Sequence, residues 1–301
     1  MRVLFMGTPD FAVPSLQKLV SAGHDVCAVF TRQDKPVGRG MKLTPPPVKV
    51  CAAELGIPVY QPQSLKTEES LELVRSLAPE VIVVVAFGML LPESILSLPP
   101  KGCINIHGSV LPKYRGSAPV QWTVLNGDKI GGVSSMYMAK ALDAGDVIDV
   151  LTTEVGEDET SGELYDRLAE LGSGLLITTL DKINAGEAVA VPQNEAEVTW
   201  APPLTKDMAV IDFENQTAQQ IHNLVRGMLP WPVAKATIGS TVFKVFKATA
   251  EEGKGVPGTV ISTDKGSIRV ACREGIIAIS EIQAQGGKRM GAGDYLRGHK
   301  L

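Results

Sequence analysis

The chain has 301 residues and a mass of 32.0 kDa, which is enough for two domains of ordinary size. Apolar residues make up 44% of it and charged residues 21%, so the composition excludes disorder as the main state. The longest apolar run, residues 81–87, is too short to span a membrane, and the first residues lack the pattern of a signal peptide. We therefore expect a folded cytoplasmic protein.

The charge is unevenly distributed along the chain. The net charge is −4, but residues 1–206 carry −7 and residues 207–301 carry +3. Within the acidic part, residues 32–49 hold five Lys or Arg residues against a single Asp. A basic stretch on an acidic domain indicates an anionic partner at that place.

Short apolar runs alternate with segments of helical periodicity in the first half of the chain. This alternation predicts βαβ units, and hence an α/β fold with a doubly wound, Rossmann-like, mostly parallel sheet. The unbroken, largely β-branched run Val81–Ala86 is typical of a buried central parallel strand. Strands are expected at Arg2–Met6, Asp25–Thr31, Val59, Val81–Ala86, Gly102–His107, Gly132–Met138 and Val147–Thr153, and helices at Ser15–Ala22, Val48–Leu55, Ser70–Leu77 and Thr160–Asn184, with an irregular loop at Pro45–Pro47.

The last third of the chain has a different pattern. One helix, Ala218–Met228, is followed by five short runs of alternating apolar residues separated by Gly and charged turns, which is typical of a small antiparallel, OB-like β-barrel. We expect a first domain at residues 1–189, a linker at 190–206 and a second domain at 207–301.

Two polar side chains share one face at the end of a predicted strand. Alternation places Asn105 and His107 together, and the strand then ends at Gly108. Ligands of open α/β sheets lie just beyond the carboxyl ends of the strands. The pair is therefore a candidate active site, although a single His is more often structural than catalytic.

A turn after a later strand, Leu142–Asp146, presents a carboxylate at Asp143. The residue could simply cap its own turn. It gains a chemical role only if it lies beside His107, where it would orient the imidazole ring. The sequence leaves both alternatives open.

A set of short motifs occurs in order along the chain: Met6–Ala12, Gly38–Gly40, Lys42–Leu43, Pro47–Lys49, Asn105–Pro112, Arg115–Pro119, Leu142–Gly145 and Pro230–Pro232. Together these motifs resemble those of the bacterial methionyl-tRNA formyltransferases over essentially the whole chain. The Asn-x-His and Leu-Asp-x-Gly pair is shared by the wider group of folate-dependent formyltransferases, whereas the basic Gly-Arg-Gly loop and the carboxy-terminal barrel are typical of the tRNA-directed members.

This resemblance implies transfer of a formyl group from 10-formyltetrahydrofolate to the α-amine of methionine on initiator tRNA. By motif, the catalytic residues would be Asn105, His107 and Asp143. The residues lining the folate pocket would be Ser109, Val110, Leu111 and Pro112. We expect tRNA contacts at Arg39, Lys42, Lys244, Lys247, Lys288 and Arg289, a monomeric protein and no metal.

The chemistry of the candidate residues agrees with this activity. When an amine attacks a formamide-like carbonyl, negative charge builds on the oxygen, and Asn105 and His107 are suitable donors to it. The amine must also lose a proton, which Asp143 and His107 could take and pass on. The four cysteines include no Cys-x-x-Cys pair, so neither a zinc site nor a disulfide framework is expected.

Three other functions remain as alternatives. A formyltransferase acting on a small amine, such as a sugar nucleotide or glycinamide ribonucleotide, would use the same site. A non-catalytic RNA-binding protein would not need the Asn105, His107 and Asp143 set. An NAD-dependent oxidoreductase is disfavoured, because residues 7–10 lack the Gly-x-Gly-x-x-Gly spacing.

Overall fold

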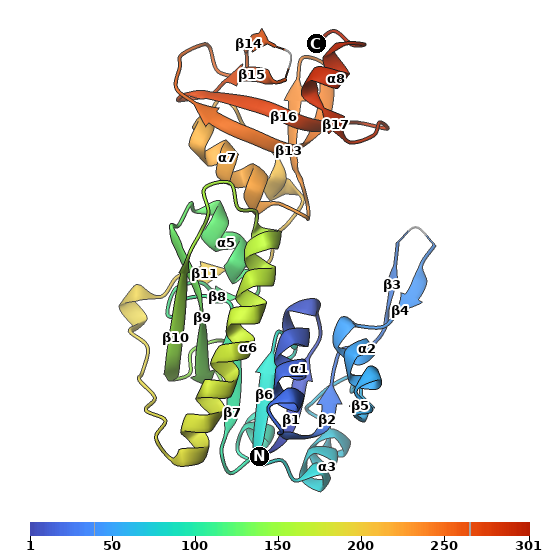
Figure 1. Cartoon of the computed structure of the whole chain (residues 1–301), viewed down its shortest axis with the longest axis vertical. Helices are drawn as coiled ribbons and strands as arrows, with labels where there is room; N and C mark the ends of the chain where they lie inside the picture. The colour runs from blue at the N-terminus through green and yellow to red at the C-terminus, as the bar shows by residue number, and fades with distance from the viewer. Residues whose placement is uncertain (39, 265) are drawn as a thin grey trace. The chain divides into compact units, whose positions relative to one another are not determined.

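The computed structural model describes residues 1–38, 40–264 and 266–301 (Figure 1). Their contacts divide the chain into two compact units, neither of which is one continuous stretch. Unit 1 contains Met1–Gly116, Gly131–Thr153 and Tyr165–Trp200. Unit 2 contains Ser117–Ile130, Glu154–Leu164 and Ala201–Leu301. No helix of the described residues is both long and apolar enough to cross a membrane.

Unit 1 is built on a seven-stranded sheet with the order β10-β9-β7-β6-β1-β2-β5. The pairs among β5, β2, β1, β6 and β7 are parallel, and β9 is antiparallel to β7. The predicted doubly wound, mostly parallel sheet is thus confirmed. The strands are β1 (Arg2–Gly7), β2 (Asp25–Phe30), β5 (Val59–Tyr60), β6 (Val81–Val85), β7 (Cys103–His107), β9 (Ile130–Tyr137) and β10 (Val147–Glu154).

The centre of this sheet is fully apolar, because helices cover both faces. All five residues of β6 are buried, as its unbroken Val and Ile run predicts. Val74 of α3 (Glu68–Leu77) and Ile95 of α4 (Glu93–Leu96) belong to the core cluster on one face. On the other face lie α1 (Val13–Ser21) and α6 (Ser161–Ala185) (Figure 1). At Gly172 of α6, a Cβ would come within 2.9 Å of Ile106 on β7.

Two helix starts show how local sequence sets the element bounds. A capping box begins α6, since the Glu163 N–H donates to Thr160 Oγ1 and the Thr160 N–H donates to Glu163 Oε2. The prediction that Pro45–Pro47 is wholly irregular is wrong at its last residue, because Pro47 begins α2 (Pro47–Glu54). Proline is well tolerated at that first helical position, where its missing N–H would have no intrahelical partner.

A small hairpin of β3 (Lys35–Val37) and β4 (Lys42–Thr44) was not expected from the sequence (Figure 1). Its base is fixed by Lys49, whose Nζ lies 2.8 Å from Asp34 Oδ1 and 2.8 Å from Gln61 Oε1. Part of the positive charge of this basic stretch is therefore already paired within the protein.

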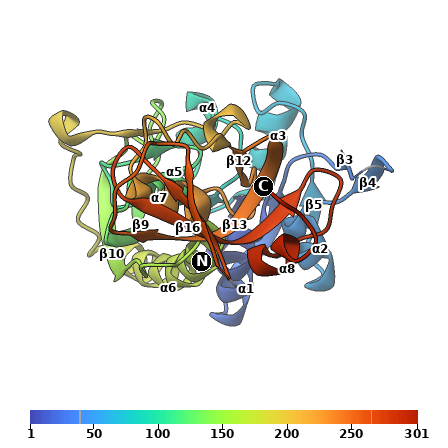
Figure 2. The same ribbon diagram turned by 90° about the horizontal axis from the view of Figure 1, so that it is seen from above.

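Unit 2 contains an antiparallel sheet, as predicted, with the order β12-β13-β16-β15-β14 and with β17 paired to β16. Helix α7 (Ala218–Gly227) packs on β13 and β16, and α5 (Pro119–Leu125) packs on α7 (Figures 1 and 2). The strands are β12 (Ala234–Ile238), β13 (Thr241–Glu251), β14 (Val260–Thr263), β15 (Ile268–Ala271), β16 (Ile276–Ala284) and β17 (Met290–Gly291), and α8 (Ala292–Leu296) ends the set.

A buried arginine explains why residues 154–164 belong to unit 2. Arg226 of α7 donates to the carbonyl oxygens of Gly156 and Glu159 and to Asn223 Oδ1. Burial lowers the pKa of Arg226 from its usual value, because the charged form is desolvated. The hydrogen bonds compensate that cost by satisfying the guanidinium.

Candidate active site

Asn105 and His107 lie at the carboxyl end of β7 and are both buried. Asn105 Nδ2 donates to the carbonyl oxygen of Val84 on the neighbouring strand, at 3.1 Å. This bond uses one of its two amide hydrogens. Asn105 Oδ1 is buried and has no hydrogen-bond partner among the residues that the structure describes. Both polar ends of the carboxamide therefore retain hydrogen-bonding capacity for a ligand.

The His107 ring is fixed by one backbone contact. His107 Nε2 lies 2.9 Å from the carbonyl oxygen of Tyr114. A carbonyl can only accept, so Nε2 carries the proton in this contact. The Tyr114 N–H in turn donates to Thr199 Oγ1 at 2.9 Å, which holds that carbonyl in place. The backbone contact leaves the other ring nitrogen, Nδ1, unprotonated in the neutral ring.

Asp143 lies beside that second nitrogen. Its Oδ2 is 3.8 Å from His107 Nδ1 and accepts a 2.9 Å hydrogen bond from the Gly116 N–H. Both side chains are largely shielded from solvent, with 8% of His107 and 13% of Asp143 exposed. The Asp143 carboxylate thus contacts Gly116, which is distant in the sequence. It also lies close to His107, as a chemical role for Asp143 requires.

The backbone around Asp143 is tightly constrained. Asp143 itself has φ 50°, in the left-handed region that few side chains other than Asn and Asp adopt readily. Two residues later, a Cβ on Gly145 would lie 1.7 Å from the carbonyl oxygen of Tyr137. Only glycine allows the turn to approach the strand this closely.

The predicted folate residues, 109–112, form the loop that follows β7. Ser109 and Leu111 are buried, and internal hydrogen bonds hold the loop. Ser109 Oγ donates to the Lys113 carbonyl at 2.6 Å, and Ser134 Oγ bridges the Ser109 carbonyl and the Leu111 N–H. The loop is therefore a preformed wall beside Asn105 and His107.

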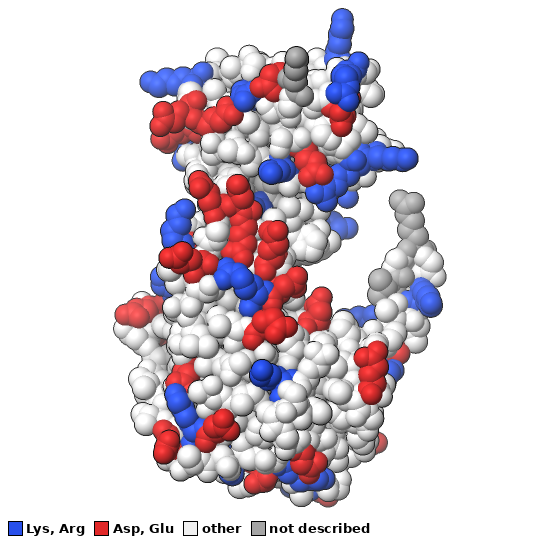
Figure 3. Space-filling model, in the orientation of Figure 1, with Lys and Arg blue, Asp and Glu red and all other residues white. Residues whose placement is uncertain are grey.

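The predicted tRNA residues are placed to different degrees. Arg39 lies outside the described residues, and Lys42 is exposed on β4. Lys244 and Lys247 are exposed on β13, where Phe243, Val245 and Ala248 point into the core. Figure 3 shows Lys and Arg side chains gathered over the hairpin from β16 to β17, which contains Lys288 and Arg289.

Arg289 already has partners within unit 2. Its guanidinium makes two hydrogen bonds to Glu281 and lies 4.3 Å from the centre of the Phe246 ring. The hydrogen bonds from Arg289 hold the pKa of Glu281 below its usual value. Arg289 is exposed, but its guanidinium is already held by these contacts.

Sequence reasoning missed a polar cluster that contacts the Asp143 turn. Arg115, which is buried, donates from Nε to Gln193 Oε1 and from its two terminal nitrogens to the Glu195 carboxylate. Gln193 Nε2 donates to the carbonyl oxygens of Asp143 and Gly145. Arg115 belongs to one of the recognised motifs, but residues 193–195 lie in a stretch without periodicity that gave no signal.

The thiol on the same strand face offers no nucleophile. Burial raises the pKa of Cys103 to about 12, so the thiolate is scarce at neutral pH. Within residues 1–38, 40–264 and 266–301, no group of three His, Cys, Asp or Glu side chains is placed to hold a metal ion. The polar groups gathered at the site are the Asn105 amide, the His107 imidazole and the Asp143 carboxylate.

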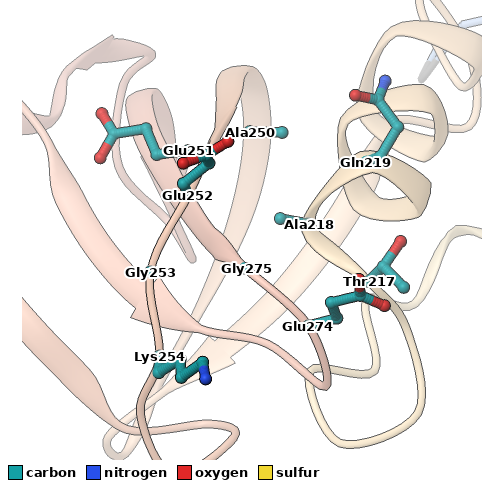
Figure 4. A pocket seen from close by; sticks show the side chains of 10 residues that line it. All are labelled: Thr217, Ala218, Gln219, Ala250, Glu251, Glu252, Gly253, Lys254, Glu274 and Gly275. Carbon is teal, nitrogen blue, oxygen red and sulfur yellow. The ribbon is translucent and has the colours of Figure 1, made fainter.

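Unit 2 contains a separate pocket of about 610 Å³ at the start of α7 (Figure 4). Thr217 and Glu251, which line it, are already engaged in the α7 capping box and in an ion pair with Arg269. It contains none of the predicted site residues, which places it apart from the candidate chemistry.

Comparison with known proteins defines the class to which this fold and site belong. Residues 1–180 match the model of the formyl transferase family, and residues 203–300 match the model of the formyl transferase C-terminal domain. The chain therefore belongs to the formyl transferase family, as its motifs predicted.

Its relatives specify the branch of the family. The chain is 46% identical over 303 residues to the methionyl-tRNA formyltransferase of Alkaliphilus oremlandii, covering 100% of this chain and 97% of that protein. It is 48% identical to that of Pelotomaculum thermopropionicum, with 99% and 96% covered. The fold is also similar to an N-formyltransferase from Helicobacter canadensis solved with folinic acid and dTDP-3-aminofucose, with a TM-score of 0.68, 18% identity and 93% and 99% coverage.

Proposed function

We propose that this enzyme transfers the formyl group of 10-formyltetrahydrofolate to the α-amine of methionine esterified to initiator tRNA. The observation that carries the proposal is 46–48% identity to methionyl-tRNA formyltransferases through both units of the chain. A formyltransferase for a small amine would share the Asn105 and His107 site but would not need the exposed lysines of unit 2. We further expect the enzyme to act as a monomer in the cytoplasm.

Asn105 is assigned to the formyl oxygen. During attack by the amine, this oxygen gains negative charge, and a donor already fixed in a buried site stabilises it without reorganisation. The hydrogen bond of Asn105 Nδ2 to Val84 orients the carboxamide and leaves one N–H for the substrate. The unpartnered Oδ1 can accept from the attacking amine.

His107 is assigned to proton transfer through Nδ1. Because Nε2 donates to Tyr114, a neutral ring presents its lone pair at Nδ1 and can take the proton from the amine. Asp143 then lies opposite the positive charge that forms. The bond from the formyl carbon to the amine forms, the bond to folate N10 breaks, and the proton passes from His107 to the departing N10.

The co-substrate and the tRNA are assigned to separate surfaces. The preformed loop at residues 109–112 supports the placement of the folate beside Asn105. For the tRNA, we propose the outward face of β13 with Lys244 and Lys247, the β16–β17 hairpin and the β3–β4 hairpin with Lys42. Exposed lysines attract phosphates, and the rigid Phe246 and Arg289 pair offers a surface on which a base can stack.

The proposal is tested by comparing formyl acceptors. Purified enzyme is given 10-formyltetrahydrofolate with either charged initiator methionyl-tRNA, glycinamide ribonucleotide or an amino-sugar nucleotide. We expect formylation of the methionyl-tRNA, with turnover on the small amines lower by orders of magnitude. Efficient transfer to a small amine without transfer to the tRNA would reject the proposal, and binding of the tRNA without any transfer would favour a non-catalytic RNA-binding protein.

A further inference from the structure

We infer that Gln193 is a positioning residue for the reaction, which holds the Asp143 turn at the distance from His107 that proton transfer requires. This inference rests on the proposed role of Asp143. Gln193 lies outside the sequence motifs, and its side chain contacts the Asp143 turn and Arg115 rather than the reacting groups.

The carboxamide of Gln193 is fully used in one arrangement. Nε2 donates at 2.8 Å to the carbonyl oxygen of Asp143 and at 2.8 Å to that of Gly145, so its two hydrogens bracket Ala144. Oε1 accepts at 3.0 Å from Arg115 Nε. An amide is the group that satisfies both sides, because it donates twice and accepts from a cation.

Arg115 fixes this amide in its orientation. Its side chain is only 4% exposed, and its remaining nitrogens lie 2.7 and 3.2 Å from the two oxygens of Glu195. These hydrogen bonds hold the pKa of Glu195 below its usual value. With its guanidinium satisfied by Glu195 and Gln193, Arg115 determines which end of the Gln193 amide faces the turn.

Contacts from two sides hold the Asp143 carboxylate and its turn. Gly116 follows Arg115 directly, and its N–H donates to Asp143 Oδ2. The Asp143 turn is therefore held at its backbone by Gln193 and at its side chain by the residue next to Arg115. Asp143 adopts a left-handed φ, and these external contacts hold the turn in that conformation.

The substitution Gln193→Glu tests this role with little change in shape. It keeps the acceptor for Arg115 but places an oxygen opposite the two carbonyl oxygens, which repels the turn. Gln193→Ala removes the donors without adding charge. A displacement of about 1 Å can cost about 10²-fold in rate, so we expect kcat to fall by about that factor in both variants. The KM values for folate and tRNA should stay within about twofold.

Asn194→Asp provides a matched control. It makes the same amide-to-carboxylate change at the next residue, which is exposed. The variant retains the acceptor for the Ala196 N–H and loses only the exposed hydrogen bond from Asn194 Nδ2 to Glu197 Oε1. Its kcat should equal that of the parent. Parental kcat in either Gln193 variant, a loss in KM alone, or unfolding of both variants would overturn the inference.

A double-mutant cycle with Asp143→Asn separates this inference from the proposed function. If Gln193 acts through the Asp143 carboxylate, adding Gln193→Glu to Asp143→Asn should cost less than about threefold further, because coupled residues are not additive. A full additional loss would show that Gln193 acts elsewhere and would overturn the inference alone. Parental activity of Asp143→Asn would overturn both the inference and the role of Asp143.

Discussion

The carboxylate of Asp143 lies 3.8 Å from Nδ1 of His107, while the opposite ring nitrogen is bound to the Tyr114 carbonyl. The two side chains come from different parts of the sheet, a strand end and a later turn. Their approach gives the imidazole one nitrogen fixed by the backbone and one nitrogen facing a carboxylate. This asymmetry is what a residue that takes up and releases a proton during each turnover requires.

Replacing Asp143 by Asn should lower kcat by about 10²–10⁴-fold, the usual contribution of a proton-transfer group. The amide keeps the size of the side chain and its acceptor for the Gly116 N–H, so the fold should persist. Single-turnover rates and circular dichroism measure the two effects. Asp146→Asn, at an exposed position in the same turn region, is the control, and equal loss in both variants would remove Asp143 from the mechanism.

Gly145→Ala should abolish most activity, because its Cβ would lie 1.7 Å from the Tyr137 carbonyl oxygen and the turn must move. Gly174→Ala on α6 makes the same chemical change where a Cβ meets no described neighbour within 4 Å. This control should gain about 0.5–1 kcal/mol in free energy of unfolding, as expected for Gly to Ala within a helix. Thermal unfolding and turnover decide the matter, and full activity of Gly145→Ala would contradict the close packing.

Local sequence pattern predicts the central strand and the placement of two candidate site residues. The apolar run at Val81–Val85 predicts a central parallel strand, and alternation places Asn105 and His107 on one face of β7. The β3–β4 hairpin was missed, because each of its strands is only three residues long, which is too short to show alternation. The position of Asp143 depends on tertiary contacts alone, which spacing in the chain cannot supply.

The double substitution of Lys244 and Lys247 by Glu should raise KM for methionyl-tRNA while leaving kcat at saturation near that of the parent. Each lost phosphate contact should also reduce the slope of log affinity against log salt by about one. Lys254→Glu changes the same type of charge elsewhere in unit 2 and serves as the control. Unchanged tRNA affinity at every salt concentration would exclude the outward face of β13 as the binding surface.

Glu251→Gln should reduce stability at neutral pH but not in acid. Hydrogen bonds from Arg269 lower the pKa of Glu251 in the folded protein. Between this lowered pKa and the ordinary Glu pKa, the unfolded state therefore binds more protons than the folded state. The contribution is present above the ordinary Glu pKa and is lost as pH falls through the lowered value. For a partly exposed pair we expect about 0.2–1 kcal/mol.

This pH dependence is measured by thermal unfolding of the parent and Glu251→Gln from neutral to acid pH. The neighbouring Glu252→Gln corrects for the change in net charge. A difference between Glu251→Gln and the parent that grows as pH falls would contradict the sign of the effect.

The Gln193 contacts mark the limit of what the sequence could reveal about the site. The motif that contains Arg115 supports the family resemblance, but it does not show which side chain Arg115 binds. Gln193 was assigned to a linker, because residues 190–206 show no periodic apolar pattern. Its two bonds to the Asp143 turn depend on a chain path that only the folded structure specifies.

The most direct test of this account is a single-turnover measurement of formyl transfer from 10-formyltetrahydrofolate to charged initiator methionyl-tRNA by the parent enzyme and His107→Ala. The account predicts that the parent formylates the α-amine of the esterified methionine. It predicts that His107→Ala, although folded, does so about 10²–10⁴-fold more slowly. Absence of formylmethionine with the parent enzyme, or an equal rate of formylation with His107→Ala, would contradict this account.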